Sequence, residues 1–268
     1  MILPLENNII DKKYSVDLWS TSKGTQSKYY KNNYWYKLNC MGCEGLAEEL
    51  TSVILSCSNI KNYVTYKQCE INGKRGCKSE SFLKTGEQFI PFNNLYKSYY
   101  GNEISDDISL FRTPEEKFNF IVEFVQKTTG MDCTEYLQDI FAVDCLIKNP
   151  DRHFGNLGLI LKMDGTYKFA PIFDNGQGLY QNFQITPPYL DDDEKDERLC
   201  AATISSNFER QMQIAGNRLQ IDYEKLYEKL SVYPESIAKR CLYNQLNKYK
   251  KIFAINEIER DDPAFNYE

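Results

Sequence analysis

One short stretch of the chain combines residue types that phosphoryl transfer uses. Residues 148–160, KNPDRHFGNLGLI, form this catalytic stretch, and it holds His153, the only histidine among 268 residues. Phosphoryl transfer needs a carboxylate that deprotonates a hydroxyl, ligands for a metal ion that holds the phosphates, and a lysine that neutralises them. Asp151 could be the base, and Asn156 could offer an amide oxygen to the metal. We expect His153 to brace the stretch, because Asp151 already fills the position of the base, and Arg152 to pair with a carboxylate or order the loop.

A second polar motif, PIFDNG, supplies another carboxylate, Asp174. Two short strands, LGLILK and YKFAPIF, joined by a turn at Asp164–Gly165, should bring it back towards Asp151. Its carboxylate could bridge metal ions, with Gly176 allowing a tight turn. Mg²⁺ prefers a few carboxylate and carbonyl oxygens together with phosphate, which fits Asn156 and Asp174. Each motif alone is more simply explained as a solvated turn, and only their combination favours a site.

A lysine on an aromatic strand is the third component. Lys37 lies in YWYKLN, where an unpaired ammonium would be costly to bury. It either extends to water from an edge strand or pairs with a carboxylate on the next helix and with nucleotide phosphates. Glu48 and Glu49 are the candidates on that helix, EGLAEELTSVILSCS, and the sequence does not decide between them.

A loop of small residues precedes this strand. Residues 19–28, WSTSKGTQSK, could place backbone N–H groups, including those of Gly24 and Thr25, against phosphates. Most loops rich in Ser, Thr and Gly are plain turns, so the loop gains meaning only beside the other motifs.

The elements that must position these motifs change character along the chain. The first third predicts strands with turns at Asn32–Asn33 and Asn72–Gly73, on either side of one helix. The pattern then becomes helical, with a capping box that begins at Thr113. A helix near 133–148 is apolar almost all round and should be buried, and Pro150 should end it just before Asp151.

The last third, from about residue 203, is predicted to be helical. Asp222 can cap one helix, and another carries an apolar stripe. The charged run DDDEKDER, residues 191–198, is typical of a solvated loop, and docking of a substrate there is the less favoured alternative. The pattern as a whole predicts an α+β protein with a small β-rich lobe, residues 1–85, and a larger helical lobe, residues 86–268. The polar motifs fall at the junction, where ligand sites are common.

Composition narrows the class of protein. No run of about 18 apolar residues exists, so we expect no membrane span, and residues 1–15 lack the pattern of a signal peptide. We therefore expect a cytoplasmic protein, and export to a host without a cleaved signal stays open. The net charge of −6 and pI of about 5.1 predict no nucleic-acid partner. The nine cysteines should be free thiols, and a metal at the lone Cys40/Cys43 pair is not expected.

The order of these motifs resembles that of a known family. A small-residue loop, a strand lysine, a helix glutamate, D-R-H-x-x-N and F-D-N-G resemble the HipA-like serine/threonine kinases, and most closely the short standalone bacterial CtkA-type kinases. The segments WYKLNCMGCEGLAEE and GCKSESFL are similar as well. The resemblance covers roughly residues 18–185. It implies a two-lobed protein-kinase-like fold that binds ATP and Mg²⁺, or Mn²⁺, in the cleft.

The resemblance also implies roles for individual residues. Asp151 would be the catalytic base, Asn156 and Asp174 would bind metal, and Lys37 would contact the α- and β-phosphates. The hinge that contacts adenine would consist of Ser81, Phe82 and Leu83. The phosphate loop of such kinases can be autophosphorylated, and the acceptors available here are Ser20, Thr21, Ser22, Thr25 and Ser27.

The expected activity is transfer of the ATP γ-phosphate to Ser or Thr hydroxyls of a protein substrate and of the protein itself. A phosphoinositide-type lipid kinase is one alternative, because D-R-H-x-x-N also occurs there, but the acidic run 191–198 disfavours it. A nucleotide-binding pseudokinase is another, disfavoured because every candidate catalytic residue is present. The extra N-terminal domain of full-length HipA toxins has no counterpart in the sequence, which argues against an antitoxin–operator role.

Overall fold

The computed structural model describes residues 5–16 and 26–255. The predicted phosphate-loop residues Gly24 and Thr25, and the candidate acceptors Ser20, Thr21 and Ser22, lie outside these ranges.

The small lobe is built on a six-stranded sheet with the order β1-β5-β6-β4-β3-β2. Its neighbouring strands are antiparallel except for the parallel pair β1 and β5. The strands are β1 (Asn7–Asn8), β2 (Ser15–Val16), β3 (Lys28–Lys31), β4 (Tyr34–Leu38), β5 (Tyr66–Ile71) and β6 (Lys74–Glu80), with a 3-10 turn at Lys12–Tyr14. Helix α1 (Glu44–Ser56) packs on this sheet against β5 and β6.

Both predicted hairpin turns of the small lobe are confirmed. Asn32 and Asn33 have φ values of 51° and 66°, and Asn72 and Gly73 have values of 51° and 74°. Positive φ at both central residues gives the twist that joins adjacent antiparallel strands. The first hairpin sets β3 against β4 and the second sets β5 against β6.

A second, three-stranded sheet connects the small lobe to the catalytic stretch. It consists of β7 (Gln88–Pro91), β8 (Gly158–Leu161) and β9 (Tyr167–Phe169), in that order and antiparallel. The predicted hairpin at Asp164–Gly165 is confirmed, although its second strand ends at Phe169 rather than near residue 173. Strand β7 was not predicted.

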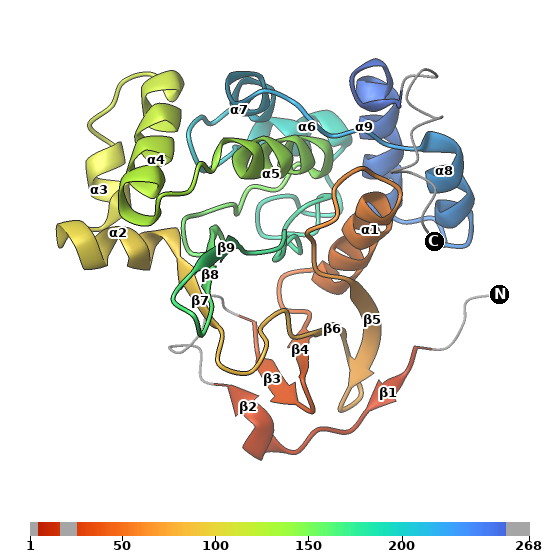
Figure 1. The fold of residues 1–268 in the computed structure, drawn as a ribbon. Helices are drawn as coiled ribbons and strands as arrows, with labels where there is room; N and C mark the ends of the chain where they lie inside the picture. The colour runs from red at the N-terminus through yellow and green to blue at the C-terminus, as the bar shows by residue number, and fades with distance from the viewer. Residues whose placement is uncertain (1–4, 17–25, 256–268) are drawn as a thin grey trace.

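Helices make up most of the large lobe (Figure 1). They are α2 (Phe92–Tyr100), α3 (Ile104–Ile108), α4 (Pro114–Thr129), α5 (Thr134–Ile147), α6 (Asp192–Arg198), α7 (Phe208–Ala215), α8 (Tyr223–Ser231) and α9 (Ile237–Phe253). The capping box at Thr113 and the cap of α8 by Asp222 are confirmed. Helix α5 is buried along its last two turns, as its apolar sequence predicts. It ends at Ile147, because Lys148 adopts a left-handed conformation two positions before Pro150.

The prediction of a solvated loop at residues 191–198 was wrong. The run forms helix α6, whose N-terminus carries a capping box between Asp191 and Glu194. Lys195 within it is fully buried and donates to the carbonyl oxygen of Leu190. The capping box and this buried lysine stabilise a helix where charge alone suggested an irregular segment.

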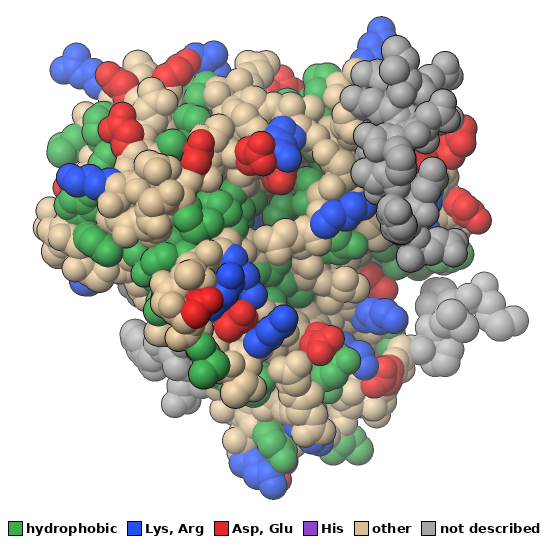
Figure 2. Space-filling model, viewed as in Figure 1, with side chains coloured by type: hydrophobic (Ala, Val, Ile, Leu, Met, Phe, Trp, Pro, Cys, Tyr) green, Lys and Arg blue, Asp and Glu red, His purple; other side chains and the backbone are tan. Residues whose placement is uncertain are grey.

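The two lobes meet around α1, and the α+β architecture is as predicted. Figure 1 shows the six-stranded sheet below, the helices above, and α1 between the sheet and α8 and α9. One large apolar cluster joins α1 to the helices of the large lobe. On the face in Figure 2, basic and acidic side chains are interspersed. Within the described part of the chain, no helix is both long enough and apolar enough to cross a membrane. The division at residue 85 stays a prediction.

Candidate active site

Lys37 is the centre of a buried charge cluster between the lobes. Strand β4 lies inside the sheet, between β6 and β3, so the alternative of an edge lysine is wrong. The Lys37 Nζ lies 3.0 Å from Glu48 Oε1, 2.7 Å from Asp174 Oδ1 and 3.4 Å from the Tyr66 hydroxyl. Burial acts to lower the pKa of Lys37, but the two carboxylates outweigh it and raise that pKa well above its usual value. The ammonium is therefore charged at neutral pH.

The structure decides which glutamate of α1 faces Lys37. Glu48 is buried, and its second carboxylate oxygen, Oε2, accepts a hydrogen bond of 2.9 Å from the backbone N–H of Asn175. Glu49 points elsewhere and accepts hydrogen bonds from Gln68 and from the Tyr233 hydroxyl. Glu48 thus links the strand lysine to the segment that carries Asp174.

Asp174 is held in an unusual backbone conformation beside this lysine. Its φ is 60°, in the left-handed region that aspartate tolerates better than most residues. Burial acts to raise the pKa of Asp174, but the ammonium groups of Lys37 and Lys28 outweigh it and hold that pKa well below its usual range. Because the positive φ belongs to Asp174 and not to Gly176, Asp174 makes the tight turn that was predicted at Gly176. Gly176 is needed for space, because a Cβ there would lie 3.0 Å from Cβ of Glu44.

Asn156 offers a free oxygen next to the candidate base. Its amide Nδ2 donates a hydrogen bond of 3.0 Å to the carbonyl oxygen of Asp151. Its Oδ1 is buried and has no hydrogen-bond partner among the described residues. A buried amide oxygen without a partner is costly unless a ligand satisfies it. Together with the ionised carboxylate of Asp174, this oxygen fits the hard-cation ligand set that the sequence suggested.

The backbone of the catalytic stretch is braced from within. His153 Nδ1 accepts a hydrogen bond of 3.0 Å from the Gly155 N–H, and the His153 N–H donates to the carbonyl oxygen of Asp151. These contacts agree with the bracing role expected of the histidine. Burial raises the pKa of Asp151 above its usual value, while His153 opposes this shift and Asp174 adds to it.

Arg152 anchors the catalytic stretch to helix α5. Its guanidinium is buried and forms two-pronged hydrogen bonds of 2.9–3.2 Å with the carboxylate of Asp144 in α5. It also donates to the carbonyl oxygen of Phe173 and to Oδ1 of Asn175, on either side of Asp174. The expected pairing of Arg152 with a carboxylate is confirmed. Asp144 was missed, although a lone acid in the apolar run FAVDCLI is a visible signal.

One solved structure shares this arrangement of elements. The chain matches the crystal structure of the proinflammatory kinase CtkA of Helicobacter pylori with a TM-score of 0.65 and 18% sequence identity. The match covers 93% of this chain and 96% of that chain. The chain has the fold of that kinase. The predicted two-lobed, CtkA-type kinase fold is confirmed.

A chain from the Shewanella oneidensis MR-1 toxin–antitoxin complex of HipA, HipB and operator DNA also matches. Its TM-score is 0.45 at 13% identity, over 90% of this chain and 67% of that chain. No family model matches the sequence, and no curated protein matches it at a significant level.

A second buried lysine, which was not predicted as a site residue, lies beside Lys37 in the kinase-like fold. Lys28 in β3 is the register partner of Lys37 in β4, so both side chains leave the sheet on the same face. Burial lowers the pKa of Lys28, and the charge of Asp174 opposes this shift. The sequence could have predicted this pairing, because Lys28 and Lys37 are equally spaced from the turn at Asn32–Asn33 and therefore lie opposite each other in the hairpin.

The predicted hinge joins the two sheets of the kinase-like fold. The Leu83 N–H donates a hydrogen bond of 3.3 Å to Ser81 Oγ, and the Phe82 ring packs against those of Phe89 and Phe173. The segment therefore lies at the same junction as the charge cluster. Contact with adenine stays a prediction, as does phosphate binding by Gly24 and Thr25.

Proposed function

We propose that this protein is an ATP-dependent protein serine/threonine kinase that also phosphorylates itself. The observation that carries the proposal is the contact of Lys37 with both Glu48 and Asp174, directly beside the catalytic stretch. Kinases need a strand lysine paired with a helix glutamate, and a metal-binding aspartate in place at the same time. The kinase-like fold supports the proposal further.

Each residue then has a role in phosphoryl transfer. Lys37 exchanges its contact with Asp174 for the α- and β-phosphates of ATP, while Glu48 keeps its ammonium in position. Asp151 orients the acceptor hydroxyl and takes its proton. Mg²⁺ held by Asn156 Oδ1 and Asp174 would neutralise charge on the phosphates. Lys28, on the same face as Lys37, supplies a second cation near them.

Protein is the proposed acceptor rather than lipid. A lipid kinase requires a basic surface towards an anionic membrane, whereas helix α6 exposes Asp193 and Glu197. Autophosphorylation of the loop around residues 20–27 follows from the resemblance to HipA-like kinases and is part of the proposal.

Incubation with Mg²⁺ and labelled ATP tests this function directly. We expect label on the protein itself and on a generic basic protein, with phosphosites among Ser20, Thr21, Ser22, Thr25 and Ser27. Mg-ATP at about 100 times its Kd should stabilise the fold by about 2.7 kcal/mol in a thermal-shift measurement. Label found only in added inositol lipid would favour a lipid kinase. Mg-ATP binding without any transfer would favour a pseudokinase.

The two neighbouring glutamates of α1 provide a matched pair of variants. Glu48→Gln removes the charge that holds Lys37, so we expect kcat/KM for ATP to fall by about tenfold or more. In Glu49→Gln the amide oxygen can still accept from Gln68, and the amide NH₂ can donate to the Tyr233 hydroxyl, so we expect a change below about twofold. Steady-state kinetics at varied ATP concentration measures both. Equal losses in the two variants would contradict the assignment of Glu48.

A further inference from the structure

The chain that follows Asp174 leaves the site and returns to it. Residues 175–203, which we name the return segment, begin at Asn175, whose side chain accepts a hydrogen bond from Arg152. They end at Thr203, whose hydroxyl donates a hydrogen bond of 2.6 Å to the carbonyl oxygen of Arg152. Both ends of the segment are thus fixed to Arg152, the residue that follows the candidate base Asp151.

Backbone strain is concentrated in this region. Seven non-glycine residues in the described part of the chain have positive φ, and four of them are Lys148, Asp174, Leu179 and Tyr180. Side chains such as those of Leu, Tyr and Lys rarely adopt this conformation unless their surroundings hold it. The Leu179 N–H donates a hydrogen bond of 2.6 Å to the carbonyl oxygen of Ile147, at the end of α5. Something must therefore hold the return segment against the C-terminus of α5.

Lys148 contacts the return segment from the end of α5. It follows the last residue of α5, three positions before Asp151, and its side chain is buried. Its ammonium forms an ion pair with Asp196 of α6 and lies 5.6 Å from the centre of the Tyr180 ring. The Tyr180 hydroxyl donates to the same carboxylate of Asp196. One buried lysine thus ties together two distant parts of the return segment.

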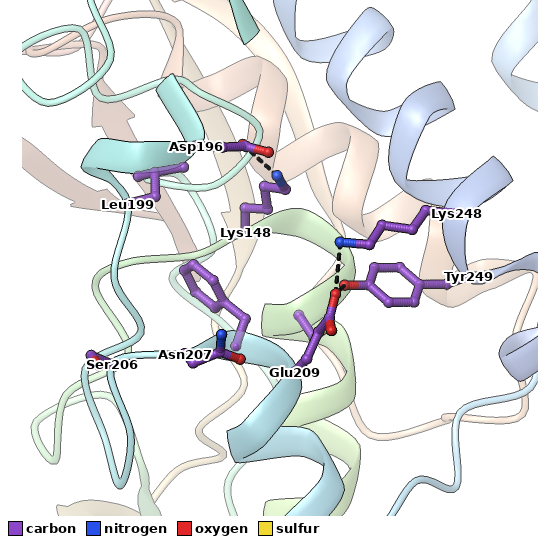
Figure 3. A pocket seen from close by; sticks show the side chains of 10 residues that line it. Lys148, Asp196, Leu199, Ser206, Asn207, Glu209, Lys248 and Tyr249 are labelled. Carbon is purple, nitrogen blue, oxygen red and sulfur yellow. Dashed lines mark hydrogen bonds and ion pairs between the residues drawn. The ribbon is translucent and has the colours of Figure 1, made fainter. Parts of the chain in front are cut away.

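A cavity of about 220 Å³ separates this ion pair from a second one (Figure 3). Lys148 and Asp196 meet on one side of it. On the other side, Glu209 at the start of α7 accepts hydrogen bonds from Lys248 and Tyr249 of α9. The second pair joins two helices of the large lobe and involves no residue of the return segment, so it is a natural control.

We propose that Lys148 is a positioning residue, and that its ion pair with Asp196 latches the return segment onto the catalytic stretch so that a protein substrate can bring its hydroxyl to Asp151. The proposal rests on the proposed kinase function for the substrate, but the latch itself is a property of the fold. A loosened segment would disturb the catalytic stretch, where the acceptor hydroxyl must reach Asp151. Lys148 and Asp196 make no contact with Asn175, whose N–H donates to Glu48, so we expect Lys37, Glu48 and Asp174 to keep their contacts on the nucleotide side of the site.

Hydrogen exchange and steady-state kinetics on Lys148→Met and Lys248→Met test the latch. In Lys148→Met we expect amide exchange in residues 191–199 to rise by about tenfold, because the opening of this segment becomes easier. We expect KM for the acceptor protein to rise by about tenfold, with KM for ATP changed by less than about twofold. Lys148→Arg should restore both values, and Lys248→Met should leave both at the level of the unmodified protein.

Asp196→Asn is the second variant, since the Asp196 side chain is 44% exposed and its replacement should not prevent folding. It should reproduce the effects of Lys148→Met, and the double variant should be no worse than either single one. Unchanged exchange in both single variants, or the same effects in Lys248→Met, would overturn the proposal. If the unmodified protein transfers no phosphate, the proposed function fails, and the exchange measurements still decide whether the latch exists.

Discussion

Asp151→Asn should lower the rate of phosphoryl transfer by about 10²–10⁴-fold, the range typical of a lost general base. Asparagine keeps the size of the side chain, and the backbone contacts of Asp151 with Asn149, His153 and Asn156 do not involve its carboxylate. The nucleotide should still bind, because Lys37, Glu48 and Asp174 remain unchanged. The expected result is a large loss in kcat with Mg-ATP binding retained, measured by single-turnover transfer and by thermal shift.

His153→Gln is the matched control within the same stretch. A brace affects the reaction only through the position of Asp151, so we expect a loss of about tenfold or less. If His153→Gln were as damaging as Asp151→Asn, the histidine would take part in the proton transfer. Full activity in Asp151→Asn would show that Asp151 is not the general base.

Local elements were predictable because their causes lie within a few residues. The capping box at Thr113 and the turns at Asn32–Asn33 and Asn72–Gly73 depend on backbone geometry that neighbouring side chains determine. The buried helix α5 follows from its apolar sequence. In α6, by contrast, eight charged residues suggested a loop. Its capping box of Asp191 and Glu194 is a local signal that was missed, whereas the burial of Lys195 depends on the fold and is not revealed by composition.

The site was predictable in its residue types but not in its contacts. Lys37 and Asp174 are 137 positions apart, and this separation in the sequence says nothing about the distance between them in the folded chain. The choice between Glu48 and Glu49 depends on how α1 is rotated against the sheet, which packing decides. Lys28 could have been found, because the turn at Asn32–Asn33 fixes its register with Lys37. Asn156 was proposed as a metal ligand from its type alone, and only the structure shows that its oxygen is free of partners in the described chain.

Arg152→Met should destabilise the fold by about 3–5 kcal/mol, the cost of leaving a buried charge without its partner. Asp144 is fully buried in α5, and the described residues that satisfy its carboxylate are Arg152 and Asn149. The carbonyl oxygen of Phe173 and the side chain of Asn175 would lose donors as well. Urea unfolding of the variant and the unmodified protein gives the difference in the free energy of unfolding.

An exposed ion pair provides the control for this loss. Arg210 pairs with Glu115 at the surface, where both side chains are about half exposed. Arg210→Met should therefore cost no more than about 1 kcal/mol. If Arg152→Met cost no more than Arg210→Met, the buried pair would not be what anchors the catalytic stretch.

The pH dependence of the unfolding free energy lost in Arg152→Met shows whether the unpaired carboxylate of Asp144 causes the loss. Burial raises the pKa of Asp144, and Arg152 opposes that shift in the unmodified protein. Without the guanidinium the folded-state pKa rises further above the unfolded value, so the folded variant binds a proton more readily than the unfolded chain does. The unfolding free energy of the variant should then increase as the pH falls through the folded-state pKa of Asp144 towards the unfolded value. The difference between Arg152→Met and the unmodified protein should be smaller near about pH 5 than near about pH 8. If the difference in unfolding free energy stays constant over this range, the loss comes from packing and from the contacts with Phe173 and Asn175. The carbonyl group of Phe173 and the side chain of Asn175 do not titrate.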